Sequence, residues 1–216
     1  QAVFAVPPFI SDMVEKGWLG AKSGQGFFIK KGKDILEINP QTLEYGEMKK
    51  LKTASMAQAT QVKGLANRVK LLTYADDRVG ELLWNILAPT LRYAAQLHGE
   101  IADDIVAIDN AMKWGFGWTQ GPFEIWDALG VAQSVEKMKA EGHEIPAFVE
   151  KMLADGFETF YSELDGDVAY YNGEGYEKVP TNAKEINLKR YKKKHGVIKS
   201  NTGASLIDLG DGIALL

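Results

Sequence analysis

Two glycine-rich segments are the first candidates for ligand chemistry, because closely spaced glycines let backbone N–H groups approach a phosphate. Residues 20–26 carry one of them, and the other has glycines at positions 115, 117 and 121. In the first, Lys22 and Ser23 precede the final glycines, whereas in a P-loop they follow them. The second is one residue too long for a dinucleotide loop and follows an expected helix instead of a strand. We therefore interpret the first as a tail turn packed under its own helix, and the second as a tight turn between helices.

The residues that bind metals or act as nucleophiles are sparse. The chain has no cysteine, which excludes disulfides, cysteine zinc sites and thiol nucleophiles and fits a reducing compartment. Its histidines are His98, His143 and His195, and none has a second ligand four residues away on one helix face. We predict no metal site. His98 and His143 are expected on the surface near helix ends, where an imidazolium interacts favourably with the helix dipole.

A dense group of aromatic residues lies between positions 114 and 126. Their helical spacing favours a role in the core or at a domain interface, and their density suggests an acyl-chain pocket as the second interpretation. These candidates for an interface or acyl pocket are Trp114, Phe116, Trp118, Phe123 and Trp126.

Basic residues gather between positions 184 and 199. With Tyr191 as the one aromatic residue among them, the segment lacks the features of a nucleic-acid site, and the net charge of −4 is uninformative about partners. We interpret it as a solvated linker helix with no nucleic-acid partner; contact with the phosphates of a ligand or with an acidic partner surface is the alternative. The residues are Lys184, Lys189, Arg190, Lys192, Lys193, Lys194 and Lys199.

The stretch 104–130 predicts a helix, a glycine turn and a second helix. Ile105, Ile108 and Met112 form an apolar stripe with helical period, and Asp109 and Lys113 have the spacing of an i, i+4 ion pair. Gly115 and Gly117 are expected to break the first helix. Pro122 suits the first position of the second helix, and Gly130 suits its end.

Other elements follow from periodicity and from turn residues. We predict helices over 9–17, 77–97, 131–141 and 146–155, with Asp76 as the N-cap of the second and Pro89 kinking it. We predict hairpins over 27–38 and over 205–216, the latter with an Asp211-Gly212 turn. Residues 40–64 are expected to be a polar linker with one weak helix. Asn182 and Glu185 are expected to start a short basic helix that Gly196 ends.

An internal repeat links two distant parts of the chain. Residues 146–157 resemble residues 7–18, so that Met152 pairs with Met13, Gly156 with Gly17 and Phe157 with Trp18. We match the aromatic segment 169–171 in one copy with 27–29 in the other. A repeated segment indicates that one structural unit is used twice.

The stretch 109–130 resembles the signature of the C-terminal helical domain of 3-hydroxyacyl-CoA dehydrogenases. Residues 7–29 resemble the last helix and the Gly-x-Lys-Ser-Gly-x-Gly-Phe tail of the same domain. The matching residues of the signature are Asp109, Ala111, Met112, Gly115, Gly117, Gly121, Pro122, Phe123, Glu124, Asp127 and Gly130.

The resemblance implies a mainly α fold of this helical type with small β-hairpin appendages. We expect residues 1–33 to be the tail of a first helical repeat, 34–75 a linker with a hairpin strand, and 76–172 a complete second helical domain. We expect 173–196 to be a linker with the basic helix, and 197–216 to resemble the start of an enoyl-CoA hydratase domain. The chain begins at Gln1 and ends inside an apolar strand, so we expect a fragment of a bacterial multifunctional β-oxidation protein.

The family oxidises 3-hydroxyacyl-CoA to 3-oxoacyl-CoA with NAD, using a Rossmann domain, a His–Glu pair and an asparagine. The resemblance places these groups before Gln1, so we predict no catalytic and no cofactor-binding residue here, and no activity of the chain alone. Asn85 lies one residue from the family asparagine, because the ungapped match falls on Trp84. The expected partners are the missing Rossmann domain and first helical repeat, acyl-CoA in the longer protein, and a second copy in a homodimer.

A different class of function stays open. The chain is alternatively a stand-alone helical scaffold with no enzymatic parent, which binds a partner helix through the aromatic residues between 114 and 126. No apolar run approaches the roughly 20 residues that a membrane-spanning helix needs, and no signal peptide is visible. We therefore expect a cytoplasmic protein.

Overall fold

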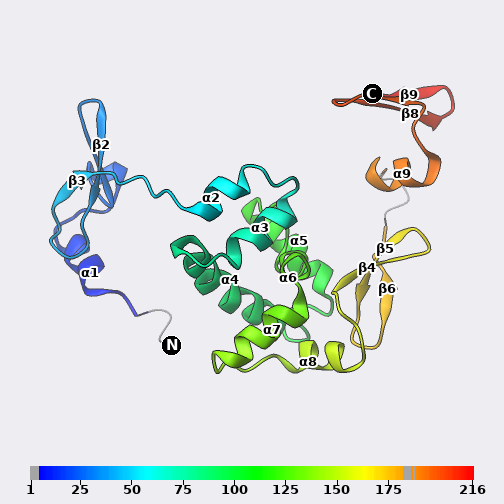
Figure 1. The fold of residues 1–216 in the computed structure, drawn as a ribbon, viewed down its shortest axis with the longest axis horizontal. Helices are drawn as coiled ribbons and strands as arrows, with labels where there is room; N and C mark the ends of the chain where they lie inside the picture. The colour runs from blue at the N-terminus through cyan, green and yellow to red at the C-terminus, as the bar shows by residue number, and fades with distance from the viewer. Residues whose placement is uncertain (1–4, 182–185, 187) are drawn as a thin grey trace. The chain divides into compact units, whose positions relative to one another are not determined.

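A computed structural model describes residues 5–181, 186 and 188–216 of the chain (Figure 1). The chain divides into two compact units, Gln1–Lys52 and Thr53–Leu216, which are described separately below.

The first unit is a short helix followed by a three-stranded sheet. Helix α1 (Pro8–Glu15) begins after Pro7, whose fixed φ suits a helix start, and Gly17 with φ +71° ends it. A single 3₁₀ turn (Ala21–Ser23) leads to strands β1 (Phe28–Lys31), β2 (Asp34–Ile38) and β3 (Tyr45–Glu47), which pair antiparallel in that order. The predicted helix and hairpin are confirmed. Strand β3 was not predicted, and it lies within the expected linker.

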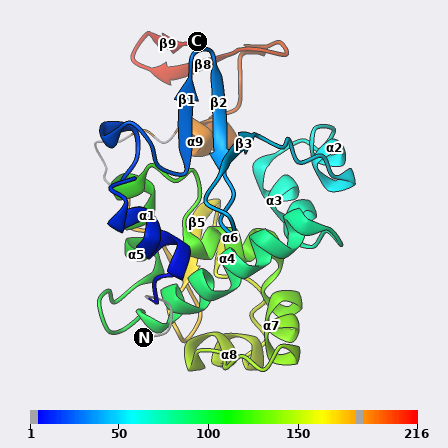
Figure 2. The same ribbon diagram turned by 90° about the vertical axis from the view of Figure 1, so that its left-hand side faces the viewer.

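The second unit opens with a set of helices around one core. They are α2 (Ala54–Ala59), α3 (Leu65–Thr73), α4 (Arg78–Gln96), α5 (Ile105–Phe116), α6 (Pro122–Leu129), α7 (Val131–Ala140) and α8 (Ala147–Ala154). Helix α6 contacts α3, α4, α5 and α7, so it lies in the middle of the set (Figures 1 and 2). Its residues Phe123, Trp126 and Leu129 have no exposed surface. The predicted helices over 77–97, 104–130, 131–141 and 146–155 are confirmed.

Two details of the helices differ from the prediction. Helix α4 is capped by Asp77, whose carboxylate accepts hydrogen bonds from the N–H groups of Val79 and Gly80; the predicted cap, Asp76, was one residue too early. Helix α3 was not predicted, and it falls inside the expected linker 34–75. Its apolar stripe is short, and it packs against α6, which lies about 50 residues further along the chain.

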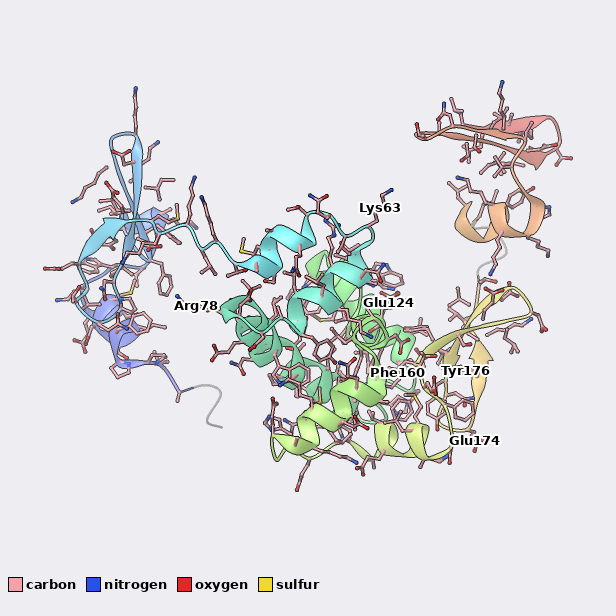
Figure 3. All side chains as sticks on the ribbon, viewed as in Figure 1. Lys63, Arg78, Glu124, Phe160, Glu174 and Tyr176 are labelled. Atoms are coloured by element: carbon pink, nitrogen blue, oxygen red, sulfur yellow. The ribbon has the colours of Figure 1, made fainter. Side chains whose placement is uncertain are left out.

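A second three-stranded sheet closes one side of this core. Strands β4 (Tyr161–Leu164), β5 (Asp167–Tyr171) and β6 (Tyr176–Lys178) pair antiparallel in that order. Phe160, Ala169 and Tyr171 of this region are fully buried. Figure 3 shows Phe160 between the helices and this sheet, with Tyr176 on the sheet.

The last part of the chain holds helix α9 (Leu188–His195) and strands β7 (Lys199–Ser200), β8 (Ser205–Gly210) and β9 (Ile213–Leu215). Strands β8 and β9 pair antiparallel, so the predicted hairpin is confirmed, and Asp211 and Gly212 both take positive φ in its turn. Gly196, which directly follows α9, also takes positive φ, as predicted for the residue that ends this helix. The predicted capping residues Asn182 and Glu185 lie outside the described residues.

The expected mainly α fold needs correction. Within the described residues, nine α-helices are accompanied by three separate three-stranded sheets, so the chain has a mixed α and β structure. The two predicted hairpins each gained a strand from segments without a clear alternating pattern, and a further sheet formed over residues 161–178, where none was predicted.

The repeat is present in the structure, with a different alignment after the helices. Strand β1 corresponds to β4, since Phe28 pairs with Glu37 as Tyr161 pairs with Tyr170. Segment 27–29 therefore matches 160–162, and the proposed match with 169–171 was wrong. The cause is a loop that is six residues shorter in the second copy, as the offset between copies falls from 139 at Met13 to 133 at Phe28.

Candidate functional site: a carboxylate scaffold and two exposed aromatic residues

The acidic residues of the signature stretch meet where α5, α6 and the β4–β6 sheet come together. Asp109 of α5 is fully buried. Its carboxylate accepts hydrogen bonds from the N–H groups of Phe123 (2.9 Å) and Glu124 (3.1 Å) and from the hydroxyl of Tyr161 (3.0 Å). Asp109 therefore caps the start of α6 from a neighbouring helix, and the predicted ion pair with Lys113 was wrong.

Glu124 and Gly121 complete the start of α6. One carboxylate oxygen of Glu124 accepts the N–H of Gly121 at 2.8 Å, and the other pairs with the Lys113 ammonium at 2.8 Å. A Cβ atom on Gly121 would lie 2.3 Å from the Cβ and Cγ atoms of Asp109. The close approach of the two helices thus requires glycine at this position.

Asp127 fastens α6 to the sheet. Its two carboxylate oxygens accept the backbone N–H groups of Phe160 (2.7 Å) and Tyr161 (2.8 Å). In the sequence, Asp127 stands out only as a signature match, and no pattern singles out Tyr161. The two residues whose N–H groups bind Asp127 lie 33 and 34 positions further along the chain, a separation that no local pattern reveals.

Burial dominates the protonation of this cluster. Loss of hydration raises the pKa of Asp109 to about 6 and that of Asp127 to about 7, although the backbone N–H groups at each carboxylate act in the opposite direction. Burial also raises the pKa of the Tyr161 hydroxyl, and the Asp109 carboxylate beside it adds to that increase. Every one of these groups has a protein partner, so the cluster has the chemistry of a structural support.

The five aromatic candidates separate into a buried and an exposed set. Phe123 and Trp126 are completely buried, and the Trp126 indole N–H donates to the Ser134 hydroxyl at 2.6 Å. Trp114 and Phe116, at the end of α5, are 81% and 75% exposed. Trp118 is partly buried. The five side chains therefore do not line one common pocket.

The glycine segments are turns. Gly117 takes φ +70° as the C-cap of α5, whereas Gly115 lies inside the helix and does not break it. In the segment 20–26, the Ser23 hydroxyl accepts the N–H of Leu19 and donates to the carbonyl of Gly20. Neither segment follows a strand and opens a helix, so neither fits the pyrophosphate of a dinucleotide.

The histidines do not form a site. His143 and His195 are exposed, but His98 is half-buried and stacks on Phe148 with ring centroids 3.9 Å apart, so its expected surface position was wrong. Burial lowers the pKa of His98. Asn85 is exposed, and Trp84 beside it is buried and donates to Glu141 at 2.7 Å. Within residues 5–181, 186 and 188–216, no group of three or more metal-binding side chains occurs.

Comparison with known proteins gives a consistent result. Residues 83–160 match the family model for the 3-hydroxyacyl-CoA dehydrogenase C-terminal domain. The whole chain is 54% identical to a probable 3-hydroxyacyl-CoA dehydrogenase of Bacillus subtilis and covers 27% of that protein. Over 127 residues, 57% of the chain, it is 30% identical to a putative fatty acid oxidation complex trifunctional enzyme of Rickettsia felis, and it covers 16% of that protein.

The chain thus spans about a quarter of the length of its Bacillus relative. No solved structure gives a significant match. None of the helices in the described part of the chain has the length and apolar character that crossing a membrane requires. Residues 83–160, which match the 3-hydroxyacyl-CoA dehydrogenase C-terminal domain, contain α5, α6 and the carboxylates of Asp109, Glu124 and Asp127.

Proposed function

We propose that this chain is the helical, substrate-side portion of an NAD-dependent 3-hydroxyacyl-CoA dehydrogenase that acts in fatty-acid β-oxidation. The longer protein oxidises the 3-hydroxyl of a 3-hydroxyacyl-CoA to a ketone and transfers the hydride to NAD. The observation that carries this proposal is the similarity of the whole chain to part of a probable dehydrogenase. The substrates are water-soluble CoA thioesters, which fits a cytoplasmic location.

The role of this portion is to support and position. The signature residues Asp109, Gly121 and Asp127 are all engaged in joining α5, α6 and the sheet. The glycine segments do not fit a dinucleotide, so we assign NAD binding and proton abstraction to the rest of the longer protein. The domain boundaries at 33, 75, 172 and 196 remain part of this proposal, as does a hydratase-like segment from residue 197.

Trp114 and Phe116 provide the contact surface in this proposal. Two large aromatic side chains exposed in the last turn of one helix are costly to leave in water, and exposed apolar groups of this size are found at interaction sites. We propose that they pack against the Rossmann domain or the acyl chain, which places them at the substrate side. A contact with a second copy of the chain is the other outcome that the experiment below separates.

The test compares the 216-residue chain with the longer dehydrogenase. The purified chain is expected to show no NAD-dependent oxidation of a 3-hydroxyacyl-CoA, while the longer protein is active. In the longer protein, the double substitution Trp114→Ala and Phe116→Ala is expected to raise KM for acyl-CoA or lower kcat by about tenfold, equal to about 1.4 kcal/mol. Turnover by the chain alone would refute the assignment.

Ile101→Ala is the matched control, because Ile101 is also exposed (66%) but lies just before the first residue of α5, whereas Trp114 and Phe116 lie in its last turn. It is expected to leave both kinetic constants unchanged. Light scattering on the same variants identifies the partner. Dissociation of a dimer without a change in KM would assign Trp114 and Phe116 to a contact between copies instead.

A further inference from the structure

Positive charge is concentrated in the segment 186–199, called the basic segment below, with helix α9 at its centre (Figure 1). The segment has six basic residues and no acidic residue, although the whole chain has a net charge of −4. The six residues are Lys189, Arg190, Lys192, Lys193, Lys194 and Lys199. The rest of the chain is therefore acidic, and the basic segment is a local patch of opposite charge.

The described lysines of the basic segment are accessible to solvent. Lys193, Lys194 and Lys199 are exposed, and Lys192 is partly exposed. Among these four lysines of the described chain, only Lys193 forms an ion pair, with Glu163. Three of the four lie in the last turn of α9, where they interact favourably with the helix dipole, but Lys199 lies beyond the helix. Stabilisation of the helix end therefore does not account for the whole patch.

Apolar side chains are exposed at both ends of the charged run. Ile186 and Leu188 are exposed before it, and Val197 and Ile198 are exposed after it. Ile198 is 62% exposed, although its N–H donates to the carbonyl of Leu206, so its backbone is fixed while its side chain lies in water. A helix rich in lysine with exposed aliphatic side chains beside it is typical of a segment that lies at a membrane surface.

The basic segment fits a lipid surface better than a nucleic acid. Proteins that bind single strands combine basic groups with aromatic side chains that stack on the bases. The one aromatic residue of the segment, Tyr191, stacks on His195 with ring centroids 4.2 Å apart. An anionic bilayer supplies phosphates for the lysines and, next to them, an apolar layer for the aliphatic side chains.

We propose that the basic segment binds the surface of an anionic phospholipid bilayer. Its lysines contact the headgroup phosphates, and Val197 and Ile198 enter the boundary between headgroups and acyl chains. The segment lies along the interface, since the eight residues of α9 are too few to cross a bilayer. No contact of α5 or α6 is involved, so lipid binding is independent of the dehydrogenase assignment.

Co-sedimentation with vesicles tests the proposal on the 216-residue chain and on the longer protein. The vesicles consist of phosphatidylglycerol and phosphatidylcholine in equal amounts, or of phosphatidylcholine alone. Binding to the anionic vesicles is expected to be at least about tenfold tighter, because each lysine near an anionic surface contributes to the affinity. Raising the salt from about 0.1 M to about 1 M shortens the Debye length from about 10 Å to about 3 Å and is expected to weaken binding about tenfold.

Three charge substitutions locate the lipid surface. The variant carries Lys192→Gln, Lys194→Gln and Lys199→Gln, which leave the ion pair of Lys193 with Glu163 in place. It is expected to bind the anionic vesicles about 100-fold more weakly, which is about fivefold for each lysine. An unchanged affinity of this variant would overturn the proposal.

The matched control removes the same charge from the first unit. Lys30, Lys31 and Lys33 are exposed in and beside strand β1. Their replacement by Gln is expected to change the affinity for anionic vesicles by less than about twofold, because the attraction acts only within about a Debye length of the lipid. Equal losses from both triple variants would show that the net charge of the chain decides binding, and would contradict a site at the basic segment.

The aliphatic side chains distinguish lipid from nucleic acid. The double substitution Val197→Ser and Ile198→Ser is expected to weaken binding to anionic vesicles about tenfold, because the affinity of interfacial segments scales with buried apolar area. Tighter binding to a single-stranded oligonucleotide than to the vesicles would overturn the proposal. Vesicle binding by the 216-residue chain that the longer protein lacks would also overturn it, because another part of that protein would then cover the basic segment.

Discussion

At the scale of single residues, the signature stretch is a set of mutually dependent contacts. Asp109 can reach the amides of Phe123 and Glu124 because Gly121 has no side chain between the two helices. Glu124 turns back to the Gly121 N–H and to Lys113. The spacing of these residues therefore has a structural cause.

The crowding at Gly121 gives a sharp prediction. Gly121→Ala is expected to lower the free energy of unfolding by about 2–3 kcal/mol, because the new methyl group overlaps the Asp109 side chain and backbone. Gly115→Ala is the matched control. No atom lies within 4 Å of its added Cβ, and it lies inside α5, so it is expected to stabilise by about 0.5–1 kcal/mol. Chemical denaturation of both variants measures the difference, and equal effects would show that α5 and α6 are not in close contact.

At the scale of elements, one carboxylate joins a helix to a sheet. Asp77 accepts three backbone N–H groups near the surface, and Asp127 accepts two in the interior. At Asp77 the hydrogen bonds outweigh the loss of hydration and lower the pKa to about 2, and the Ser55 hydroxyl makes the largest contribution. Desolvation wins at Asp127, where the pKa rises to about 7.

The pH dependence of stability follows from these opposite shifts. Between about pH 4 and 7 the folded chain binds more protons than the unfolded chain at Asp109 and Asp127, so the free energy of unfolding is expected to fall as pH rises through this range. Below about pH 4 the sign reverses for Asp77, whose contribution is lost as the pH falls toward 2. Melting curves from pH 2 to 8 are expected to show a maximum near pH 4–5.

Two asparagine variants separate these contributions. Asp127→Asn is expected to flatten the decline between pH 4 and 7 and to lower stability by about 1–3 kcal/mol, because an NH₂ group replaces one of the two oxygens that accept from Phe160 and Tyr161. Asp77→Asn is expected to change only the acid side of the curve. A pH 4–7 slope that persists in Asp127→Asn, and equally in Asp109→Asn, would contradict the assignment.

At the scale of the whole molecule, the chain consists of two units with a short connection. Residues 48–52 are exposed and have no regular secondary structure, and they hold Lys49, Lys50 and Lys52. The large buried side chains of the core cluster, from Trp84 to Tyr171, all belong to the second unit. The second unit is therefore expected to keep its fold when the connection is cut.

Limited proteolysis tests this organisation. Trypsin is expected to cut first after Lys49, Lys50 or Lys52 and to release a resistant fragment that begins near residue 53, because exposed segments outside helices and strands open most easily. Lys137 and Lys139, inside α7, serve as internal controls and are expected to be cut much later. Mass spectrometry of the early products identifies the sites. Early cleavage within α7 would contradict a stable second unit.

Local sequence patterns were sufficient to predict the features that depend on neighbouring residues in the chain. Helices α1 and α4 to α8 were predictable because their apolar residues repeat every three or four positions between proline and glycine boundaries. The last hairpin was predictable from Asp211 and Gly212, and the family from the spacing of the signature residues. Each of these signals lies within about one element of the residue that it describes.

Features that depend on partners far away in the chain became visible in the folded structure alone. In the folded chain, Asp109 binds the start of α6 and the Tyr161 hydroxyl instead of Lys113. Of the aromatic candidates, Phe123 and Trp126 are buried, whereas Trp114 and Phe116 are exposed. The folded chain also contains α3 and β3, whose stability comes from packing and pairing with other elements. The physical reason is the same throughout: burial and long-range hydrogen bonds set the free energy of these groups, and neither is encoded in the residues next to them.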